Sequence, residues 1–177
     1  SLDLSHCAKI TEIGLESMAQ FCPGLTGMSL FWCVQLKDAG LITLAEHCPG
    51  LTTLNLSHCS QISGAGLSIL AKRCSGLTSL NLSHCVHITD ADLTVLAQYC
   101  GGLTSIDLSY CAKITSAGLK GLVKHCPWLT EVNLNWCAQI TDSDLTALSQ
   151  RCPGLVSVAL THFISITDAG LTALAQY

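Results

Sequence analysis

The hexapeptide LNLSHC occupies residues 54–59, and the same six letters recur at residues 80–85. The second leucine of this hexapeptide recurs every 26 positions along the chain, at Leu4, Leu30, Leu56, Leu82, Leu108, Leu134 and Leu160. A constant interval without insertions is typical of proteins that stack one structural unit many times. The sequence therefore predicts a single repeat domain over residues 1–177, made of a partial repeat 1–21 and full repeats 22–47, 48–73, 74–99, 100–125, 126–151 and 152–177.

Each repeat changes its hydrophobic period half-way along. The segment LTSLNLS alternates apolar and polar residues as a strand does, whereas ITDADLTVLAQYC places Leu93, Leu96 and Cys100 on one face of a helix. Because a helix crosses back between successive strands, the strands run parallel. Neighbouring strands lie about 4.8 Å apart, whereas the axes of neighbouring helices need a separation of about 8–10 Å. This mismatch bends the stack. We therefore predict an α/β, right-handed, horseshoe-shaped solenoid with a parallel sheet on the concave face and helices on the convex face.

Composition excludes several classes of partner. The formal net charge is −4, and only 11% of the residues are charged, so the chain lacks the basic field that attracts nucleic acid or anionic lipid. No apolar run reaches the length of a membrane-spanning helix. We expect neither a nucleic-acid nor a membrane partner.

All 12 cysteines fall in the repeat register. One column ends the strand segment (Cys7, Cys33, Cys59, Cys85, Cys111, Cys137) and the other ends the helix (Cys22, Cys48, Cys74, Cys100, Cys126, Cys152). Such positions suit small buried side chains, so we expect reduced, mostly inaccessible thiols and a reducing compartment, cytoplasmic or nuclear. A disulfide between neighbouring repeats stays open as an alternative. Cysteine pairs with zinc-ligand spacing are absent from the sequence, and we expect no metal site.

The residue between the two leucines of each strand segment and the two residues after the second leucine are expected to face the concave surface, for example Asn55, Ser57 and His58. The column beside the first cysteine is a ring in every repeat: His6, Trp32, His58, His84, Tyr110, Trp136 and His162. Because ring and thiol point to opposite sides, a Cys–His nucleophile is not expected. The sequence also lacks a phosphate-binding glycine-rich loop. We therefore predict no enzyme activity and no cofactor.

Rings and short polar groups are the side chains that protein interfaces favour at their centres. The candidate partner-binding residues are Phe31, Trp32, Asn55, His58, Asn81, His84, Asp107, Tyr110, Asn133, Trp136 and His162. A second interpretation stays open, in which the rings only stack on one another and cover the edge of the sheet.

The repeated pattern LxxLxLxxC…ITDxxLxxLA resembles the cysteine-containing leucine-rich repeats of F-box and leucine-rich-repeat proteins, and the resemblance covers the whole chain. It implies a protein-interaction scaffold that recognises substrates for a cullin-based ubiquitin ligase. The alternative is a structural repeat element that associates with further copies through exposed terminal repeats.

Overall fold

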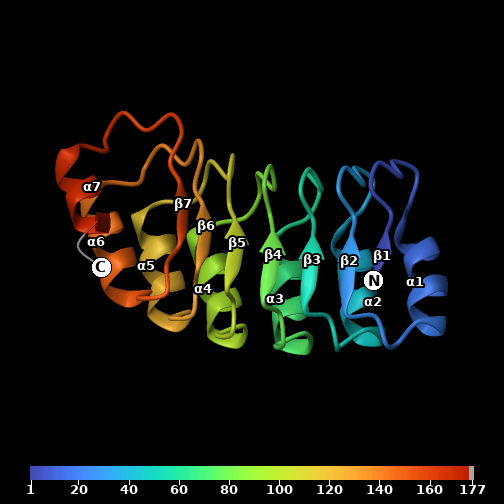
Figure 1. Ribbon diagram of the computed structural model, residues 1–177. Helices are drawn as coiled ribbons and strands as arrows, with labels where there is room; N and C mark the ends of the chain where they lie inside the picture. Colours follow the sequence, from blue (N-terminus) through green and yellow to red (C-terminus); the bar gives the residue numbers. More distant parts are fainter. Residues whose placement is uncertain (176–177) are drawn as a thin grey trace.

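The computed structural model describes residues 1–175 as a row of seven strand–helix units, with the sheet in front of the helices in Figure 1. The predicted alternation and the single parallel sheet are confirmed. The elements are β1 (Leu2–Asp3), α1 (Glu12–Phe21), β2 (Gly27–Ser29), α2 (Asp38–His47), β3 (Thr53–Asn55), α3 (Gly64–Arg73), β4 (Ser79–Asn81), α4 (Asp90–Tyr99), β5 (Ser105–Asp107), α5 (Ser116–His125), β6 (Glu131–Asn133), α6 (Asp142–Arg151), β7 (Ser157–Ala159) and α7 (Asp168–Ala175). The last two residues of predicted repeat 152–177 lie outside the described residues. None of the described helices has the length and hydropathy of a membrane span.

The sheet keeps the 26-residue register from end to end. Its strands follow one another in chain order, and each residue pairs with its equivalent in the next repeat, for example Leu54 with Leu80 and Asn55 with Asn81. The middle residue of a strand points toward the helices and is buried, as at Leu54 and Leu80. One continuous core of leucine, isoleucine and cysteine therefore fills the space between sheet and helices.

The cysteine thiols connect neighbouring repeats inside this core. Cys59 Sγ donates to the carbonyl of Leu30 over 3.2 Å, and Cys111 Sγ donates to that of Leu82 over 3.1 Å. All twelve cysteines are unpaired, and ten are buried. The ten buried thiols agree with the expectation of mostly inaccessible cysteines, whereas Cys7 and Cys22 are exposed because in the structure no repeat packs against that side of the first unit.

Helices interlock in pairs at their N-termini. The Asp90 carboxylate accepts hydrogen bonds from the Thr115 backbone N–H over 2.8 Å and from the Thr115 hydroxyl over 2.6 Å. A Cβ at Gly118 would lie 2.3 Å from Asp90 Oδ1, so this close approach requires glycine. Equivalent bonds join α2 to α3 and α6 to α7, through Asp38–Ser63 and Asp142–Thr167. This interlock therefore recurs at every second helix junction.

Candidate functional site

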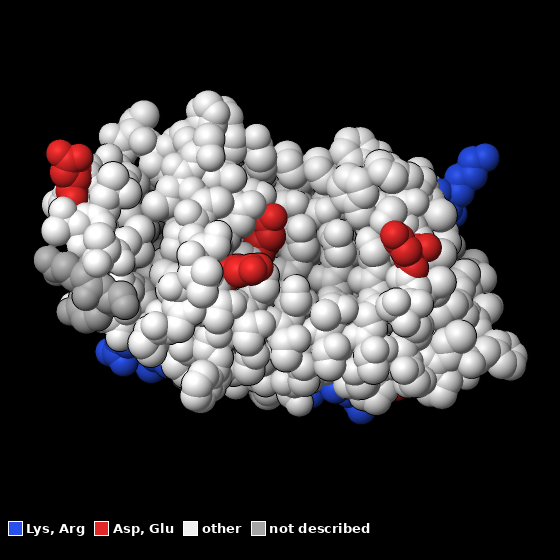
Figure 2. Space-filling view, viewed as in Figure 1, with Lys and Arg blue, Asp and Glu red and all other residues white. Residues whose placement is uncertain are grey.

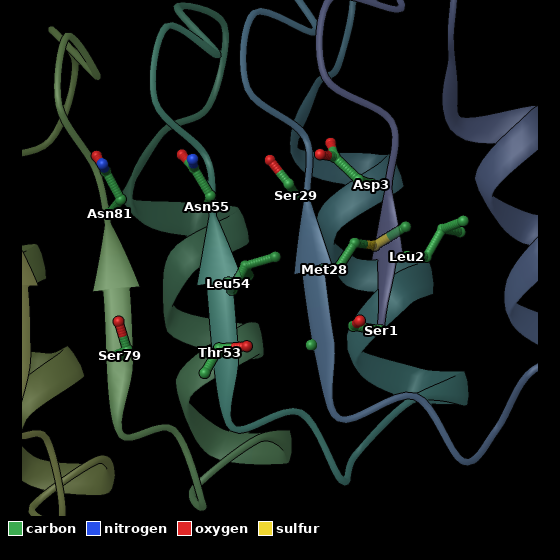
Figure 3. A pocket seen from close by; sticks show the side chains of 11 residues that line it. Ser1, Leu2, Asp3, Met28, Ser29, Thr53, Leu54, Asn55, Ser79 and Asn81 are labelled. Atoms are coloured by element: carbon green, nitrogen blue, oxygen red, sulfur yellow. The ribbon is translucent and has the colours of Figure 1, made fainter.

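Two rows of small polar side chains cover the outer face of the sheet. Figure 3 shows them on β3 as Thr53 and Asn55 and on β4 as Ser79 and Asn81. Two grooves of about 440 and 340 Å³ lie on this face, the first over β1–β4 and the second over β4–β7. The sequence analysis identified only the row that contains Asn55. The other row (Thr53, Ser79, Ser105, Ser157) could have been found from strand alternation, two positions earlier in each repeat.

The row of asparagine and aspartate side chains also forms turns at the ends of the strands. Each side-chain oxygen accepts a hydrogen bond from the backbone N–H two residues later, at distances of 2.8–3.1 Å, in five repeats (Asp3, Asn55, Asn81, Asp107, Asn133). This Asx turn mimics a backbone turn. The oxygen of Asn55 is therefore engaged within the chain, and its NH₂ group is the donor that faces outward.

The seven rings lie in the turns that follow the strands rather than on the strands themselves. Their backbone φ angles lie between 59° and 66° in every repeat, which is the left-handed region. This corrects the expectation of a column on the sheet face: the rings line the edge at which the strands end. Glycine or asparagine adopts this conformation at lower cost than an aromatic residue. The regular choice of a ring therefore calls for a compensating interaction.

Stacking supplies that interaction. We name His6, Trp32, His58, His84, Tyr110, Trp136 and His162 the ring ladder. Three neighbouring pairs stack with centroids 3.8–4.1 Å apart (His58–His84, His84–Tyr110, Trp136–His162), and Tyr110 stacks on Trp136 at 5.4 Å. Trp32 tilts by 39° over His58 at 4.4 Å. Because most ring faces lie against neighbours, the ladder presents mainly ring edges and the polar atoms on them.

The column between the asparagines and the ladder was expected to face outward, but three of its seven side chains are buried. Ser57, Ser83 and Ser109 are 3%, 8% and 6% exposed, because the turn folds them under the ladder. Phe31 occupies this column in its repeat and is half-buried, with its ring edge-to-face on His6 at 4.6 Å. Phe31 therefore supports the end of the ladder.

The charges on the sheet face are acidic. Figure 2 shows red atoms over the sheet and blue atoms only toward the edges of this view. Asp107 accepts from the Ser109 hydroxyl over 2.6 Å and from Asn133 Nδ2 over 3.0 Å, and Glu131 accepts from Ser105 Oγ over 3.2 Å. Neither groove has a lysine or arginine among its lining residues.

The pKa of His58 in the ladder is lowered from its ordinary value. Burial lowers the pKa of His58, and the neighbouring His84 lowers it further. His58 is therefore held in its neutral form over more of the pH range than a free imidazole.

The chemistry of this surface suits binding. Within residues 1–175, no group of three or more histidine, cysteine or acidic side chains is placed to hold a metal ion. Cys59 and Cys85 are fully buried beneath the turns that carry His58 and His84, so thiol and imidazole are separated. What remains is a polar sheet face with a stacked aromatic edge.

The repeat architecture can now be compared with known proteins. The family model described as "Leucine Rich repeat" matches residues 1–19, 47–71, 73–97, 103–123 and 125–149, which is about two thirds of the chain. The chain belongs to the leucine-rich-repeat family. Leucine-rich repeats generally mediate protein–protein interactions and are typically non-enzymatic scaffolds.

Solved structures agree with this leucine-rich-repeat fold. A chain of the yeast Rad7–Elc1 complex aligns with a TM-score of 0.78 at 20% identity, over 90% of this chain and 41% of that one. The leucine-rich repeat-containing protein LegL7 from Legionella pneumophila aligns with a TM-score of 0.66 at 16% identity, over 99% of this chain and 62% of its own. The present chain thus spans less than two thirds of either. No curated protein sequence gives a significant match.

Proposed function

We propose that this leucine-rich-repeat chain binds a protein partner across its sheet face, with the ring ladder as one edge of the interface. The observation that carries the proposal is the juxtaposition of an uncovered polar sheet with exposed rings along one edge. Trp32 and Trp136 are each 43% exposed and Tyr110 is 40% exposed, although Tyr110 and Trp136 stack on neighbours and Trp32 tilts over His58. Exposed tryptophan and tyrosine beside small polar groups match the composition of interface centres.

Each group of candidate residues has a separate role in the proposed interface. The amides of Asn55, Asn81 and Asn133 offer N–H donors from the sheet, while Asp107 offers a carboxylate for a basic group of the partner. Phe31 holds the ladder end in place. His58, His84 and His162 lie in the ladder and contribute ring edges. The partner thus meets hydrogen-bonding groups on the sheet and apolar contact along its edge.

The finer proposal is substrate recognition for a cullin-based ubiquitin ligase. Its support is the cysteine-containing repeat pattern, which resembles that of F-box and leucine-rich-repeat proteins. A ligase role in the cytoplasm or nucleus also agrees with buried cysteines that stay reduced. If it holds, deleting the gene lengthens the half-life of the captured partner. An unchanged half-life contradicts the ligase role and leaves partner binding standing.

Affinity capture with matched variants tests partner binding. Ser79→Trp fills the groove on the sheet face, Trp136→Ala interrupts the ladder, and Gln98→Trp places the same bulky ring on the exposed side of α4. We expect the first two variants to lose a partner that the parent chain and Gln98→Trp both retain. Thermal unfolding of each variant separates lost binding from lost folding. Retention of every partner by a folded Ser79→Trp chain contradicts the proposal.

A second candidate is association of copies through the terminal repeats. Ile13, Phe21 and Ile164 are 71%, 85% and 96% exposed there, which favours this contact. Sedimentation velocity tests it. A weight-average sedimentation coefficient that rises with concentration supports association, and a constant monomer value contradicts it.

A further inference from the structure

The turns between helices and following strands lie at the opposite end of the strands from the ring ladder, and one of them is unlike the rest. Its second residue is glycine in the other repeats (Gly24, Gly50, Gly76, Gly102, Gly154) and Trp128 between α5 and β6. None of these glycines has a positive φ, so the backbone here accommodates any side chain. Trp128 is nevertheless 69% exposed. An indole left in solvent contributes little to the core.

A second exposed apolar side chain lies in the adjacent repeat. The backbone N–H of Val156 donates to the carbonyl of Thr130 over 2.8 Å, which places the segments after both turns side by side. Val156 is 84% exposed, and the equivalent position is threonine in the repeats before it. Trp128 and Val156 therefore introduce apolar surface at the same end of neighbouring repeats.

A cation precedes each of these two turns. Lys124 and Arg151 occupy the last turns of α5 and α6, directly before the two turns, and both are exposed. The one ion pair within residues 1–175 joins Lys120 to Asp144, so neither Lys124 nor Arg151 is neutralised by an acid there. Their interaction with the helix dipole accounts for a basic residue at each helix end. It does not account for the exposed Trp128 in the turn that follows α5.

We propose that Trp128, Val156, Lys124 and Arg151 form a second docking surface, here called the α5–β6 turn surface, for an acidic protein segment that carries an apolar side chain. Tryptophan with neighbouring cations is the combination enriched at interface hot spots, and the unpaired cations select an acidic partner. A nucleic acid fits less well, because two cations supply few phosphate contacts and the exposed apolar side chains have no counterpart on a phosphate backbone.

Fluorescence anisotropy of a labelled peptide tests this surface. The probe is a short peptide of glutamates around a central Leu–Phe pair, compared with the same peptide in which lysine replaces glutamate and with an oligothymidylate. The protein variants are Trp128→Gly, which restores the residue of the other repeats, the double variant Lys124→Gln with Arg151→Gln, and Trp136→Ala as a matched tryptophan on the ladder.

We expect the glutamate peptide to bind the parent chain and Trp136→Ala equally. Trp128→Gly and the double glutamine variant should each bind it at least about tenfold more weakly, which corresponds to about 1.4 kcal/mol. Trp128→Gly should unfold at the parent temperature, because its ring is exposed. Equal affinity for both peptides, tighter binding of oligothymidylate, or undiminished binding by Trp128→Gly would each overturn the proposal.

Discussion

The imidazole rings of His58 and His84 stack with their centroids 3.9 Å apart and their planes 18° apart. Two positive charges at this separation repel each other strongly, since little solvent lies between stacked rings. Burial lowers the pKa of His58, and His84 lowers it further. The folded chain thus binds a proton at His58 less readily than the unfolded chain does, which couples the ladder to pH.

This coupling predicts that acid destabilises the ladder. A base with a folded-state pKa below its unfolded value contributes stability above the unfolded pKa, which is about 6.5 for histidine, and loses it as the pH falls through that value to the folded pKa. We expect the free energy of unfolding to fall between about pH 7.5 and pH 5, by under about 1 kcal/mol from this pair because the ladder is partly open to solvent.

Urea unfolding of His84→Phe checks the cause. Phenylalanine keeps a ring between His58 and Tyr110 and removes the charge, so the variant should lose less stability on acidification than the parent. His87→Asn, at an exposed loop position outside the ladder, is the control and should follow the parent. An identical acid response of parent and His84→Phe would show that the stacked pair is not responsible.

The helix interlock predicts opposite effects of one substitution at equivalent positions. Gly118→Ala places a methyl group 2.3 Å from Asp90 Oδ1, whereas a Cβ at Gly14, the same position in α1, meets nothing within 4 Å. We expect Gly118→Ala to destabilise by about 1–3 kcal/mol through overpacking. Gly14→Ala should stabilise by up to about 1 kcal/mol through helix propensity. Thermal unfolding that finds the same sign for both variants contradicts the interlock.

The left-handed turns predict a preference for glycine over alanine once the ring is gone. At Tyr110 the φ angle is 59°. Tyr110→Ala and Tyr110→Gly both lose the stack with His84 and Trp136, but only alanine keeps a Cβ in the left-handed region. Tyr110→Gly should therefore be more stable than Tyr110→Ala by about 1 kcal/mol in chemical denaturation. Equal stabilities would place this turn outside the left-handed region.

Thiol reactivity should divide the cysteines by exposure. Burial raises the pKa of Cys59 and Cys111 to about 12 each, with smaller contributions from neighbouring thiols, so neither forms a thiolate near neutral pH. Cys7 and Cys22 are exposed. An aromatic disulfide reagent at about pH 8 should modify these two rapidly and the other ten only after denaturation. Rapid modification of Cys59 or Cys111 in the folded chain contradicts the buried arrangement.

The repeat register predicted the fold almost completely, because the 26-residue spacing fixes strand order, pairing and core at once. Leu54 and Leu80 are buried opposite each other as alternation requires. The candidate site was predicted less well. The prediction assumed that inward-facing and outward-facing residues keep alternating beyond the end of the strand, so Ser57 was expected on the surface. In the structure the Asx turn at Asn55 ends the strand, and Ser57 is buried.

Other features depend on tertiary contacts that a single repeat does not reveal. The ladder geometry follows from positive φ at each ring, and no rule of strand periodicity predicts that conformation at His58. Likewise, the exposure of Cys7 depends on which repeats pack beside it. The glycine at position 118 matches that at position 66 in the sequence, but only the contacts with Asp90 and Asp38 explain both.

Site-specific photo-crosslinking tests the central claim, that the partner lies on the sheet face, most directly. A benzophenone amino acid placed at Ser79, on the sheet, or at Gln98, on the exposed side of α4, is irradiated in the presence of the captured partner. The account predicts a covalent product from Ser79 and none from Gln98. A product from Gln98 with none from Ser79 would place the partner on the helices and contradict it.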